Sequence, residues 1–495
     1  MKRTKIVCTI GPASESRSNI EKMIAAGLNV ARLNFSHGTY RHHAMLIRNI
    51  RGAAKVQHRS VAILQDLQGP RIRVGDLPKA GVRVKTGDSI ALVPEKFKSG
   101  HANRGVYIPI QFPTLYRYVK AGHPILIDDG KIELKVTSVK QGVIHCVVRI
   151  GDLITSHRGM NFPKSVISAP AVTDKDKQDL EFGLQQNVDF VALSFVRDAD
   201  DVIQLRHFIS KIEKQLGRKA DDFKKPAHAG SWPGTHTKII AKIERPQAVK
   251  NFESILKAAD GIMVARGDLG LEMPLEDLPL VQKKIIRRCV EESKPVIVAT
   301  QMLDSMIRYP MPTRAEVSDV ANAILDGTDA IMLSGETATG KYPLRAVQVM
   351  TRIANEVESV EISEHEKIQD TLRKSDSVTE TVSFAVQNIA VEVGARLIVC
   401  ATTSGFTARS IVKYRPAIQV VAVAATEKIK NQLCLSWGVT PYRLPFANNF
   451  NELIAKTKVL LKKEKLVKTG DRIVLSAGHP LGYLGQTNLI KVEIV

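Results

Sequence analysis

Short apolar runs alternate with amphipathic stretches through the first two-thirds of the chain. Eight runs have strand length and are apolar at nearly every position, which is typical of parallel strands buried on both faces. Between them, stretches such as NIEKMIAAG, DKQDLEFGLQQ and EVSDVANAILDG repeat apolar residues every three or four positions and predict helices. The predicted strands cover residues 5–11, 30–35, 61–67, 190–196, 238–244, 261–268, 295–301 and 329–335.

This alternation predicts an α/β fold with a (β/α)8 TIM barrel, in which a closed parallel sheet is wrapped by helices. An open doubly wound sheet is the alternative, but such a sheet gathers its ligand groups at one switch point. Several different strands of this chain end in polar residues, which favours the barrel.

Two other parts break the barrel pattern. After the third strand come short strand runs and Gly-Asp turns without a convincing helix, which predict a small β-barrel lid domain inserted in one barrel loop. Beyond a polar, charge-rich stretch the alternation resumes and predicts an open α/β domain. The expected division is 1–69 and 165–345 for the barrel, 70–164 for the lid and 346–495 for the last domain. The polar segment 217–237 is expected to be a surface loop.

Composition adds one unusual feature, a formal net charge of +21. A basic balance attracts polyanions or phosphorylated metabolites. The spread of Lys and Arg along the chain, with only 5% aromatic residues, favours small anions over a nucleic-acid surface. A nucleic-acid-binding or scaffold protein that retains an old barrel is the alternative from another functional class.

Neither a membrane span nor an export signal is visible, so we expect a cytoplasmic protein. The five cysteines are scattered without a C-x-x-C pair and predict buried, reduced thiols. The pair His42 and His43 falls in a polar helical stretch and is expected on a solvated face.

Charged and hydroxyl side chains gather where the predicted strands end. In KIIAKIE, Lys242 and Glu244 flank Ile243 and therefore point to one face of the strand. One such pair is explained equally well by an ion pair at a strand mouth, but the ends of barrel strands converge, and several strands share the feature. The other polar strand-end residues are Arg32, Asn34, Ser36, Asp66, Arg266, Asp268, Thr300, Ser334 and Glu336.

This inventory suits metal-assisted phosphate chemistry. Mg²⁺ takes one or two carboxylates and fills its other positions with water and substrate oxygens, so Glu244 and Asp268 are candidate ligands. Arg32 and Lys242 would spread the charge of a phosphoryl group during transfer. The amides of Gly267 and Asp268 would bind a carboxylate or phosphate if a helical turn begins there, whereas a simple turn with an N-cap Asp is the alternative.

Longer motifs then identify a family. In order along nearly the whole chain, TKIVCTIGPAS, ARLNFSHG, DLQGPRIRVG, IIAKIERPQAV, GIMVARGDLGLEMP, VIVATQMLDSM, PTRAEVSDVANAILDGTDAIMLSGETATGKYP and GQTNLIKV resemble pyruvate kinase. The resemblance implies a phosphotransferase that uses Mg²⁺, or Mn²⁺ in its place. It would transfer the phosphoryl group of phosphoenolpyruvate to ADP in the last step of glycolysis, giving pyruvate and ATP. It also implies a homotetramer.

The resemblance further assigns roles to individual residues. Lys242, Arg32 and Thr300 would be catalytic and, with Gly267 and Asp268, would bind the substrate, while Glu244 and Asp268 would hold Mg²⁺. The nucleotide would contact Asn34, Phe35, Ser36, His37, Arg73 and Arg158, the last standing where many members have Lys. The alternative enzyme is another barrel lyase or mutase acting on phosphoenolpyruvate or a 2-oxo acid, which would need neither the lid nor Arg73.

Two features depart from the family or go beyond its core chemistry. Many members bind K⁺ at the positions of Asn34, Ser36, Asp66 and Leu67 and carry D-T-K-G-P-E, but this chain has D-L-Q-G-P-R, which introduces Arg71. A fixed guanidinium can supply the charge of a monovalent cation, so we expect that K⁺ is not required.

The stretch TTSGFTAR is similar to the family's sugar-phosphate effector loop. It predicts a site for a phosphorylated effector, with an ordinary helix N-cap as the alternative. The predicted effector residues are Thr402, Thr403, Ser404, Gly405 and Thr407.

Overall fold

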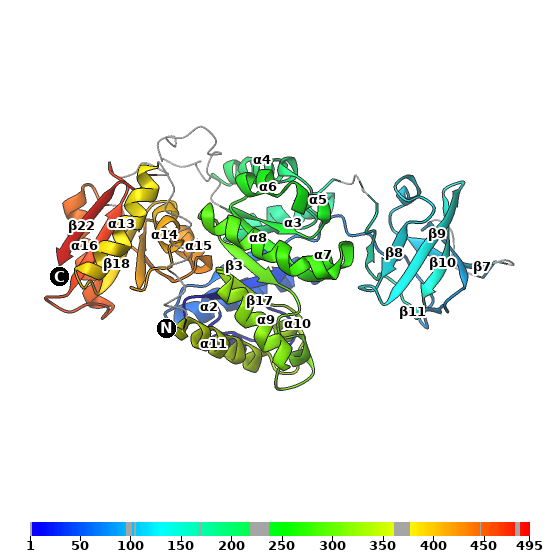
Figure 1. Cartoon of the computed structure of the whole chain (residues 1–495), viewed down its shortest axis with the longest axis horizontal. Helices are drawn as coiled ribbons and strands as arrows, with labels where there is room; N and C mark the ends of the chain where they lie inside the picture. The colour runs from blue at the N-terminus through cyan, green and yellow to red at the C-terminus, as the bar shows by residue number, and fades with distance from the viewer. Residues whose placement is uncertain are drawn as a thin grey trace.

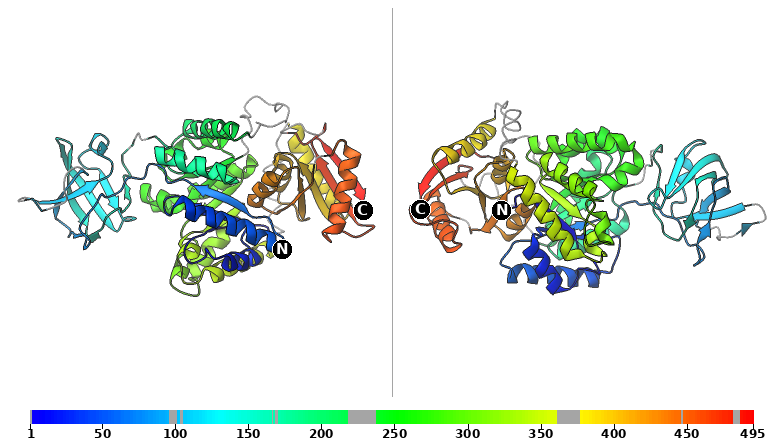
Figure 2. Two further views of the ribbon diagram at one scale, coloured as in Figure 1. Left: turned by 180° about the vertical axis from the view of Figure 1, so that it is seen from behind. Right: turned by 60° about the horizontal axis from the view of Figure 1, so that its bottom comes forward.

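The computed structural model describes residues 2–95, 101–102, 105–165, 167, 170–217, 237–360, 377–445, 447–480 and 486–495. The predicted loop 217–237 therefore lies almost entirely outside the described residues. The molecule is a row of three bodies, with the barrel in the middle and one smaller body at each end (Figure 1). Two further views show the same row (Figure 2).

Parallel strands close the central barrel in the order β1-β17-β16-β15-β14-β13-β3-β2, which confirms the predicted fold. Their pairing aligns the polar strand ends at one mouth; for example, Asn34 lies opposite Asp66 in the β2–β3 register. The strands are β1 (Lys5–Thr9), β2 (Val30–Asn34), β3 (Ala62–Asp66), β13 (Phe190–Leu193), β14 (Lys238–Ile243), β15 (Gly261–Ala265), β16 (Val296–Ala299) and β17 (Ala330–Leu333).

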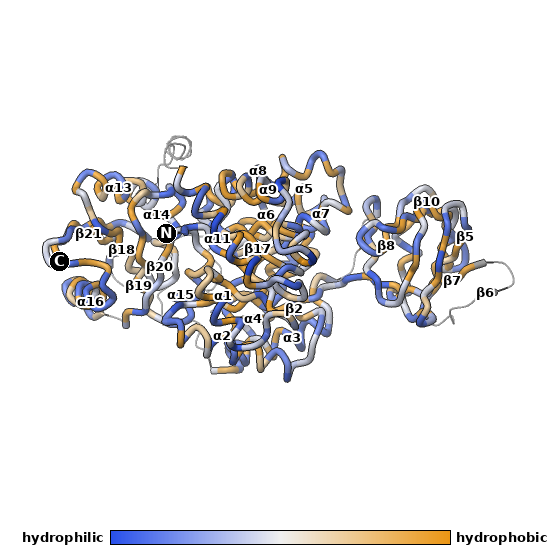
Figure 3. The backbone as a smooth tube through the Cα atoms, turned by 90° about the horizontal axis from the view of Figure 1, so that it is seen from below, coloured by the Kyte–Doolittle hydropathy of each residue, from blue (hydrophilic) through white to orange (hydrophobic). Residues whose placement is uncertain are grey.

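Helices surround the barrel and bury their apolar faces against it. Two of them begin with reciprocal capping boxes, at Thr173 and Thr313, which satisfy amides that a helix start leaves unpaired. Apolar residues concentrate along the barrel strands, as around β17 (Figure 3). The helices are α1 (Arg17–Ala26), α2 (Tyr40–Val56), α3 (Asp174–Gln185), α4 (Ala199–Gln215), α5 (Pro246–Lys250), α6 (Phe252–Ala258), α7 (Arg266–Glu272), α8 (Leu278–Glu291), α9 (Arg314–Leu325), α10 (Gly335–Ala338) and α11 (Pro343–Val360).

The inserted lid has its own apolar core, built from residues between Ile72 and Ile167. It consists of a seven-stranded sheet in the order β12-β8-β9-β10-β5-β7-β6 and the two-stranded ribbon β11-β4. Its described residues contain one 3-10 turn and no α-helix, as the sequence predicts. The strands are β4 (Val82–Arg83), β5 (Ser89–Pro94), β6 (His101–Ala102), β7 (Gly105–Ile110), β8 (Pro124–Ile127), β9 (Ile132–Lys140), β10 (Val143–Ile150), β11 (Leu153–Ile154) and β12 (Met160–Asn161).

The C-terminal domain is an open sheet in the order β20-β19-β18-β21-β22, parallel except for β22. Its strands are β18 (Leu397–Thr402), β19 (Val420–Ala424), β20 (Val439–Arg443), β21 (Arg472–Ala477) and β22 (Leu489–Ile494). Its helices are α13 (Val378–Glu392), α14 (Phe406–Val412), α15 (Glu427–Gln432) and α16 (Phe450–Lys463).

One expected domain boundary needs correction. The division between residues 345 and 346 falls inside α11. Ala346, Val347 and Met350 of this helix are fully buried in the core cluster of the barrel. The barrel unit therefore continues through α11, because the apolar face of that helix covers barrel strands.

All five cysteines are buried free thiols, as predicted. Among the described residues no helix combines the length and apolar character needed to cross a membrane.

Candidate active site

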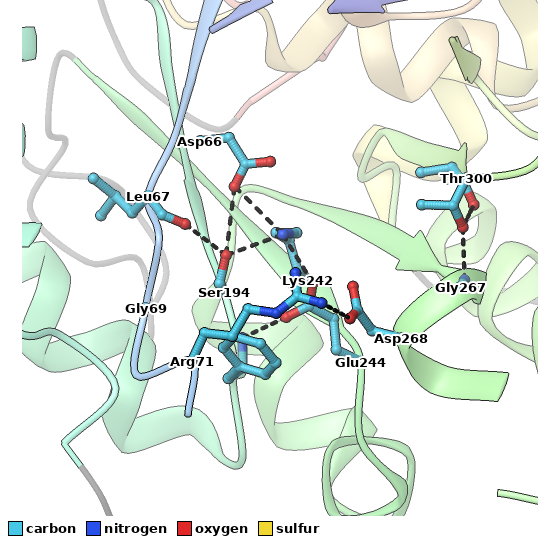
Figure 4. Close-up of polar contacts among 12 residues, drawn as sticks. Asp66, Leu67, Gly69, Arg71, Ser194, Lys242, Glu244, Gly267, Asp268 and Thr300 are labelled. Atoms are coloured by element: carbon cyan, nitrogen blue, oxygen red, sulfur yellow. Dashed lines mark hydrogen bonds and ion pairs between the residues drawn. The ribbon is translucent and has the colours of Figure 1, made fainter. Parts of the chain in front are cut away.

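A cluster of buried charges lies where β2, β3 and β14 end. Arg32 Nε lies 2.7 Å from Asp66 Oδ2, and its Nη1 donates to Thr9 Oγ1 at 2.8 Å. Lys242 Nζ lies 2.8 Å from Glu244 Oε1 and 3.4 Å from Asp66 Oδ1 (Figure 4). The structure thus brings together four of the predicted site residues, which come from three separate segments of the chain.

The charged groups in this cluster shift one another's pKa values strongly because they are buried away from water. Burial alone would raise the pKa of Asp66, but the charges of Lys242 and Arg32 outweigh it and lower that pKa. Burial would lower the pKa of Lys242, but Asp66 and Glu244 raise it above its ordinary value. For Glu244, burial raises the pKa despite the opposing charge of Lys242. Glu244 is therefore the carboxylate that would gain most from a further cation.

A turn after β13 holds both members of the Lys242–Glu244 pair. Lys242 Nζ donates to Ser194 Oγ at 3.0 Å, and the Ser194 hydroxyl donates to the Leu67 carbonyl at 2.6 Å. The next amide, Phe195 N–H, donates to Glu244 Oε2 at 2.6 Å. Sequence reasoning missed Ser194, although it ends the run FVALS in the same way that the other selected residues end their strands.

Gly267 and Asp268 open α7, so the expected helical turn is present. Gly267 N–H donates to Thr300 Oγ1 at 2.6 Å, which links α7 to the end of β16. Thr300 has φ of 71°, a left-handed conformation that is a genuine outlier for a β-branched residue. Such strain persists only where the surroundings enforce it, and it is often found at functional sites.

Arg71 reaches toward α7 and the lid. Its Nη2 lies 3.8 Å from Asp268 Oδ1 and 3.5 Å from Asp129 Oδ1 in the lid. A Cβ atom on Gly159 would lie only 2.8 Å from Arg71 Nε, so the glycine makes room for the guanidinium. Arg71 therefore brings its charge to Asp268, whereas Asp66 is paired with Arg32 and Lys242.

The segment after β2 forms a tight turn in which Asn34 Oδ1 accepts from Ser36 N–H at 3.1 Å. Phe35 is only 3% exposed and stacks on His43 with ring centroids 3.9 Å apart. The Phe35 side chain is thus part of the core, and any ligand contact it makes would be through its backbone. His37 is exposed at the surface, but neighbouring groups displace part of the water around its ring, which lowers its pKa, and the charges of Arg73, Arg71 and Arg32 lower that pKa further.

The prediction that His42 and His43 share a solvated face is wrong for His43. Its side chain is buried, and its Nε2 lies 2.9 Å from the His37 carbonyl. A polar sequence surrounds it, but its position on α2 faces Phe35 rather than water.

The two lid arginines differ in their surroundings. Arg73 Nη1 donates to the His157 carbonyl at 2.9 Å, and Arg73 is close enough to His37 to affect its pKa. Arg158 Nη1 pairs with Asp128 Oδ1 at 3.1 Å, within the lid. Arg73 thus lies beside the segment after β2, while Arg158 is held by a lid carboxylate.

Two residues of the strand-end inventory, Arg266 and Glu336, and the family cation position Leu67 are engaged in other contacts. Arg266 Nη1 pairs with Asp319 Oδ1 at 2.7 Å. Glu336 accepts hydrogen bonds from the backbone amides of Leu303 and Ser334. Leu67 is only 1% exposed, so its carbonyl alone is available as a ligand, and that oxygen already accepts from Ser194.

The donor set fits a hard divalent cation bound by few protein ligands. Within the described ranges no group of three or more His, Cys, Asp or Glu is arranged to hold a metal. The charge of Lys242 lowers the pKa of Glu244, and the charge of Asp268 raises it. Asp268 therefore lies close enough to Glu244 for the two carboxylates to share one cation. Two carboxylates are what Mg²⁺ commonly takes from a protein whose substrate supplies further oxygens.

The predicted effector loop is held by hydrogen bonds within the loop, and the N-cap residue of α14 is Gly405, with φ of 81° and no side-chain capping hydrogen bond. Thr402 Oγ1 accepts from Gly405 N–H at 2.8 Å and from Ser404 N–H at 3.4 Å. Thr407 is buried and its hydroxyl accepts from Thr487 Oγ1 at 3.0 Å. The alternative of an ordinary Ser/Thr N-cap is therefore not what the structure shows, and the role of Thr402, Thr403, Ser404, Gly405 and Thr407 in effector binding stays a prediction.

Comparisons with known proteins agree with this architecture. The family model for the pyruvate kinase barrel domain matches residues 1–220 and 214–347, and the model for the pyruvate kinase alpha/beta domain matches residues 380–493. The chain is 42% identical to pyruvate kinase of Geobacillus stearothermophilus, over 100% of the chain and 80% of the relative. It is 39% identical to pyruvate kinase of Clostridium perfringens, over 100% of both. The crystal structure of a pyruvate kinase from Cryptosporidium parvum superposes with a TM-score of 0.88 at 36% identity, covering 100% of this chain and 96% of the other.

Proposed function

Because the chain belongs to the pyruvate kinase family, a metal-dependent phosphotransferase family that acts on phosphoenolpyruvate and ADP, we propose that its strand-end cluster is where the phosphoryl group is transferred. The observation that carries this proposal is the buried ammonium of Lys242, held between Asp66 and Glu244. A cation fixed in a water-poor site stabilises charge that develops during transfer far better than one in water.

Lys242 faces the phosphoryl group and the enolate, and Arg32 contacts the phosphoryl group from the neighbouring strand. The amide of Asp268 binds the substrate carboxylate, and the amide of Gly267 joins it only by leaving Thr300 Oγ1, to which it donates at 2.6 Å. Thr300, whose hydroxyl holds the Gly267 amide, lies beside the carbon that is protonated after transfer. Cleavage of an enol phosphate needs positioning, neutralisation and protonation, and it needs no covalent nucleophile.

Glu244 and Asp268 hold Mg²⁺, or Mn²⁺ in its place. A bound divalent cation neutralises phosphate and carboxylate oxygens and orients the substrate. The raised pKa of Glu244 supports this assignment, since burial leaves that carboxylate in need of positive charge beyond Lys242.

ADP occupies the side where the lid meets the turn after β2. The supporting observation is the set of arginines that lower the pKa of His37, namely Arg73, Arg71 and Arg32. Asn34, Phe35, Ser36, His37 and Arg73 border this basic surface. Arg158 contacts the nucleotide only if a phosphate group replaces Asp128 as the partner of its guanidinium.

The reaction requires no K⁺. Leu67 brings an alkyl group to a family cation position, and Arg71 adds a fixed cation beside Asp268. In the double variant Leu67→Thr with Arg71→Glu, we expect activity to depend on K⁺ at least about tenfold more than in the wild type, since one fixed charge has been removed and a hydroxyl restored. Equal activity of the double variant in K⁺ and in tetramethylammonium would show that this pair does not determine cation use.

The proposed function is tested by ATP formation from phosphoenolpyruvate and ADP with Mg²⁺. Lys242→Met is compared with Lys238→Met, which makes the same substitution at the opposite end of β14, where the lysine pairs with Asp260. We expect loss of activity in the first variant only. Turnover of phosphoenolpyruvate that needs no ADP would favour the lyase or mutase alternative. Salt-sensitive RNA binding that persists in Lys242→Met, without ATP formation, would favour the nucleic-acid alternative.

We further propose a cytoplasmic homotetramer, by the family resemblance, with a phosphorylated effector at residues 402–407. Sedimentation velocity measures the assembly state directly. Substitution Thr403→Glu, which places a negative charge in the loop, should abolish activation by an added sugar phosphate without changing basal activity.

A further inference from the structure

The hydroxyl of Ser194 occupies the centre of the cluster, between Lys242 on β14 and Leu67 after β3 (Figure 4). Ser194 is only 2% exposed, so no bulk water replaces its hydrogen bonds. Ser194 directly follows β13, which lies between β3 and β14 in the barrel. Its hydrogen bonds therefore link the end of β13 to both neighbouring strands.

Three oxygen atoms surround the Lys242 ammonium, one through a hydrogen bond and two through ion pairs. These are Glu244 Oε1 at 2.8 Å, Ser194 Oγ at 3.0 Å and Asp66 Oδ1 at 3.4 Å. An ammonium group on a flexible four-carbon stem has no fixed direction of its own, unlike a guanidinium. Three partners around it define one position for the charge.

The direction of the Ser194 hydroxyl is fixed in turn. A serine oxygen has one proton and two lone pairs. The proton goes to the Leu67 carbonyl, 2.6 Å away, which leaves the lone pairs to face the ammonium. Ser194 Oγ also lies 3.4 Å from Asp66 Oδ1, so the hydroxyl touches the same carboxylate as the lysine.

The backbone around Ser194 is closely packed. Phe195 has φ of 57°, a left-handed conformation that turns the chain sharply and sends its amide to Glu244. A Cβ atom on Gly69 would lie 3.0 Å from Ser194 Cβ and 3.1 Å from Phe195 Cδ2. The segment after β3 therefore presses directly on this turn.

We propose that Ser194 is a positioning residue for the reaction, which holds the Lys242 ammonium at the point where the phosphoryl group passes. The inference rests on the proposed role of Lys242. Ser194 itself need not touch the substrate: it acts through Lys242, and the adjoining amide of Phe195 acts through Glu244. One turn thus aligns the cation and the metal-binding carboxylate together.

The test compares Ser194→Ala with Ser476→Ala, which removes a buried hydroxyl that donates to the Leu489 carbonyl in the C-terminal sheet. We expect Ser194→Ala to lower kcat about 10- to 100-fold, the range for losing a hydrogen bond to a charged group. The KM for phosphoenolpyruvate should change less than about threefold, because the contact matters most while charge develops. Ser476→Ala should keep the wild-type kcat.

Ser194→Cys serves as the conservative variant, since a thiol fills similar space and can both donate and accept weakly. We expect it to recover part of the lost kcat. Thermal unfolding of all the variants distinguishes a loss of folding from a displaced Lys242 ammonium. A Ser194→Ala protein that has the melting temperature of the wild type but a lower kcat supports the proposal. If Ser194→Ala is unfolded, a folded Ser194→Cys with reduced kcat and unchanged KM supports it instead.

Wild-type kcat in a folded Ser194→Ala protein, or in Ser194→Cys if the alanine variant is unfolded, would overturn this inference alone. Loss confined to KM would overturn it as well, since that pattern indicates simple substrate binding. A wild-type enzyme that forms no ATP from phosphoenolpyruvate and ADP would instead remove the proposed function on which the inference depends, so the two failures are distinguishable.

Discussion

At the scale of single residues, two buried carboxylates a few ångströms from the same lysine have different electrostatic surroundings. Asp66 receives both Arg32 and Lys242, whereas Glu244 receives Lys242 and one backbone amide. Burial tends to raise the pKa of both carboxylates. The neighbouring cations outweigh burial at Asp66 and lower its pKa, whereas the pKa of Glu244 stays raised. This asymmetry favours Glu244 over Asp66 as the place for a further cation.

The substitution Glu244→Gln tests the asymmetry, because it keeps the shape of the side chain and an oxygen for the Phe195 amide but removes the charge. We expect the Mg²⁺ concentration for half-maximal activity to rise at least about tenfold, as befits the loss of one of two carboxylate ligands. Titration of activity with Mg²⁺ and with Mn²⁺ measures this. Glu213→Gln is the matched control, since Glu213 is also buried and accepts a backbone amide, from Thr237. Equal metal dependence in both variants would contradict the assignment.

His43 gives a prediction about pH. Burial lowers its pKa, only partly offset by the His37 carbonyl. Its Nδ1 is buried and finds no hydrogen-bond partner among the described residues, so a proton placed there would be an unsatisfied charge. Below about pH 6.5 the unfolded chain takes up a proton that the folded chain excludes. The free energy of unfolding should therefore fall as the pH drops below that value.

Urea unfolding from pH 5 to 7.5 measures this slope. In His43→Gln it should flatten by up to about 1.4 kcal/mol per pH unit, the effect of one proton. His207→Gln, at an exposed position on α4, should leave the slope unchanged. A slope that persists in His43→Gln would assign it to other groups.

At the scale of elements, α7 joins the site to the lid. Its first turn carries Gly267 and Asp268, and Asp268 faces Arg71. At its last residue, Glu272 Oε1 accepts from Asn161 Nδ2 at 3.1 Å and from Phe162 N–H at 3.3 Å, where the chain leaves the lid. A seven-residue helix thus contacts the chain entering the lid at one end and the chain leaving it at the other.

Glu272→Ala should therefore loosen the connection between the lid and the barrel. We expect limited proteolysis after residue 160 to accelerate several-fold, because cleavage follows the population of locally opened chain. The KM for ADP should rise if the lid carries nucleotide contacts. Glu276→Ala, at an exposed position just beyond α7, is the control. Unchanged proteolysis of Glu272→Ala would show that other contacts hold the lid.

The existence of most elements could be predicted from the sequence, but their ends could not. The barrel strands are apolar on both faces, so their runs are visible without tertiary information. Two predicted strands, 190–196 and 261–268, end at Leu193 and Ala265. One stops at a turn that needs a left-handed Phe195, which local preference disfavours, and the other stops where α7 begins.

Two strands of the C-terminal sheet, β20 and β22, lack a clear sequence signal for a related reason. Pro441 lies inside β20 and argues against a strand in the sequence, but β20 is an edge strand, where a missing N–H is tolerated. The strand β22 occupies the other edge and is half-exposed, so it lacks a continuous apolar run.

The site was predictable in part for the same physical reason. Lys242, Glu244, Asp66 and Arg32 could be grouped because barrel topology brings strand ends together. The contacts of Arg71, Arg158 and His43 depend on lid and helix packing, which no local pattern encodes.

At the scale of the whole molecule, a different domain stands at each end of the barrel (Figures 1 and 2). The lid stands at the mouth where the strands end, and the C-terminal domain packs where they begin (Figures 1 and 2). Cys434 and Leu435 of that domain belong to the same buried cluster as barrel-interior residues such as Val7 and Met332. Asp329, just before β17, accepts from Trp437 N–H at 3.1 Å.

This packing predicts that the barrel and the C-terminal domain unfold together. Trp437 is only 3% exposed and lies at the contact, so its fluorescence reports that end of the barrel once Trp232→Phe has removed the other tryptophan. Enzyme activity in urea reports the opposite mouth. In the Trp232→Phe protein the two transitions should coincide, because both ends share one core.

Leu435→Ala should separate the two transitions, because it removes apolar contact from the shared core and leaves a cavity worth about 2–5 kcal/mol. Leu475→Ala makes the same change at a fully buried leucine of the C-terminal domain that belongs to a separate cluster. We expect it to lower stability by a similar amount while fluorescence and activity still change together. Coincident transitions in Leu435→Ala would mean that hydrogen bonds such as the one from Trp437 to Asp329, rather than the apolar contact, couple the two domains.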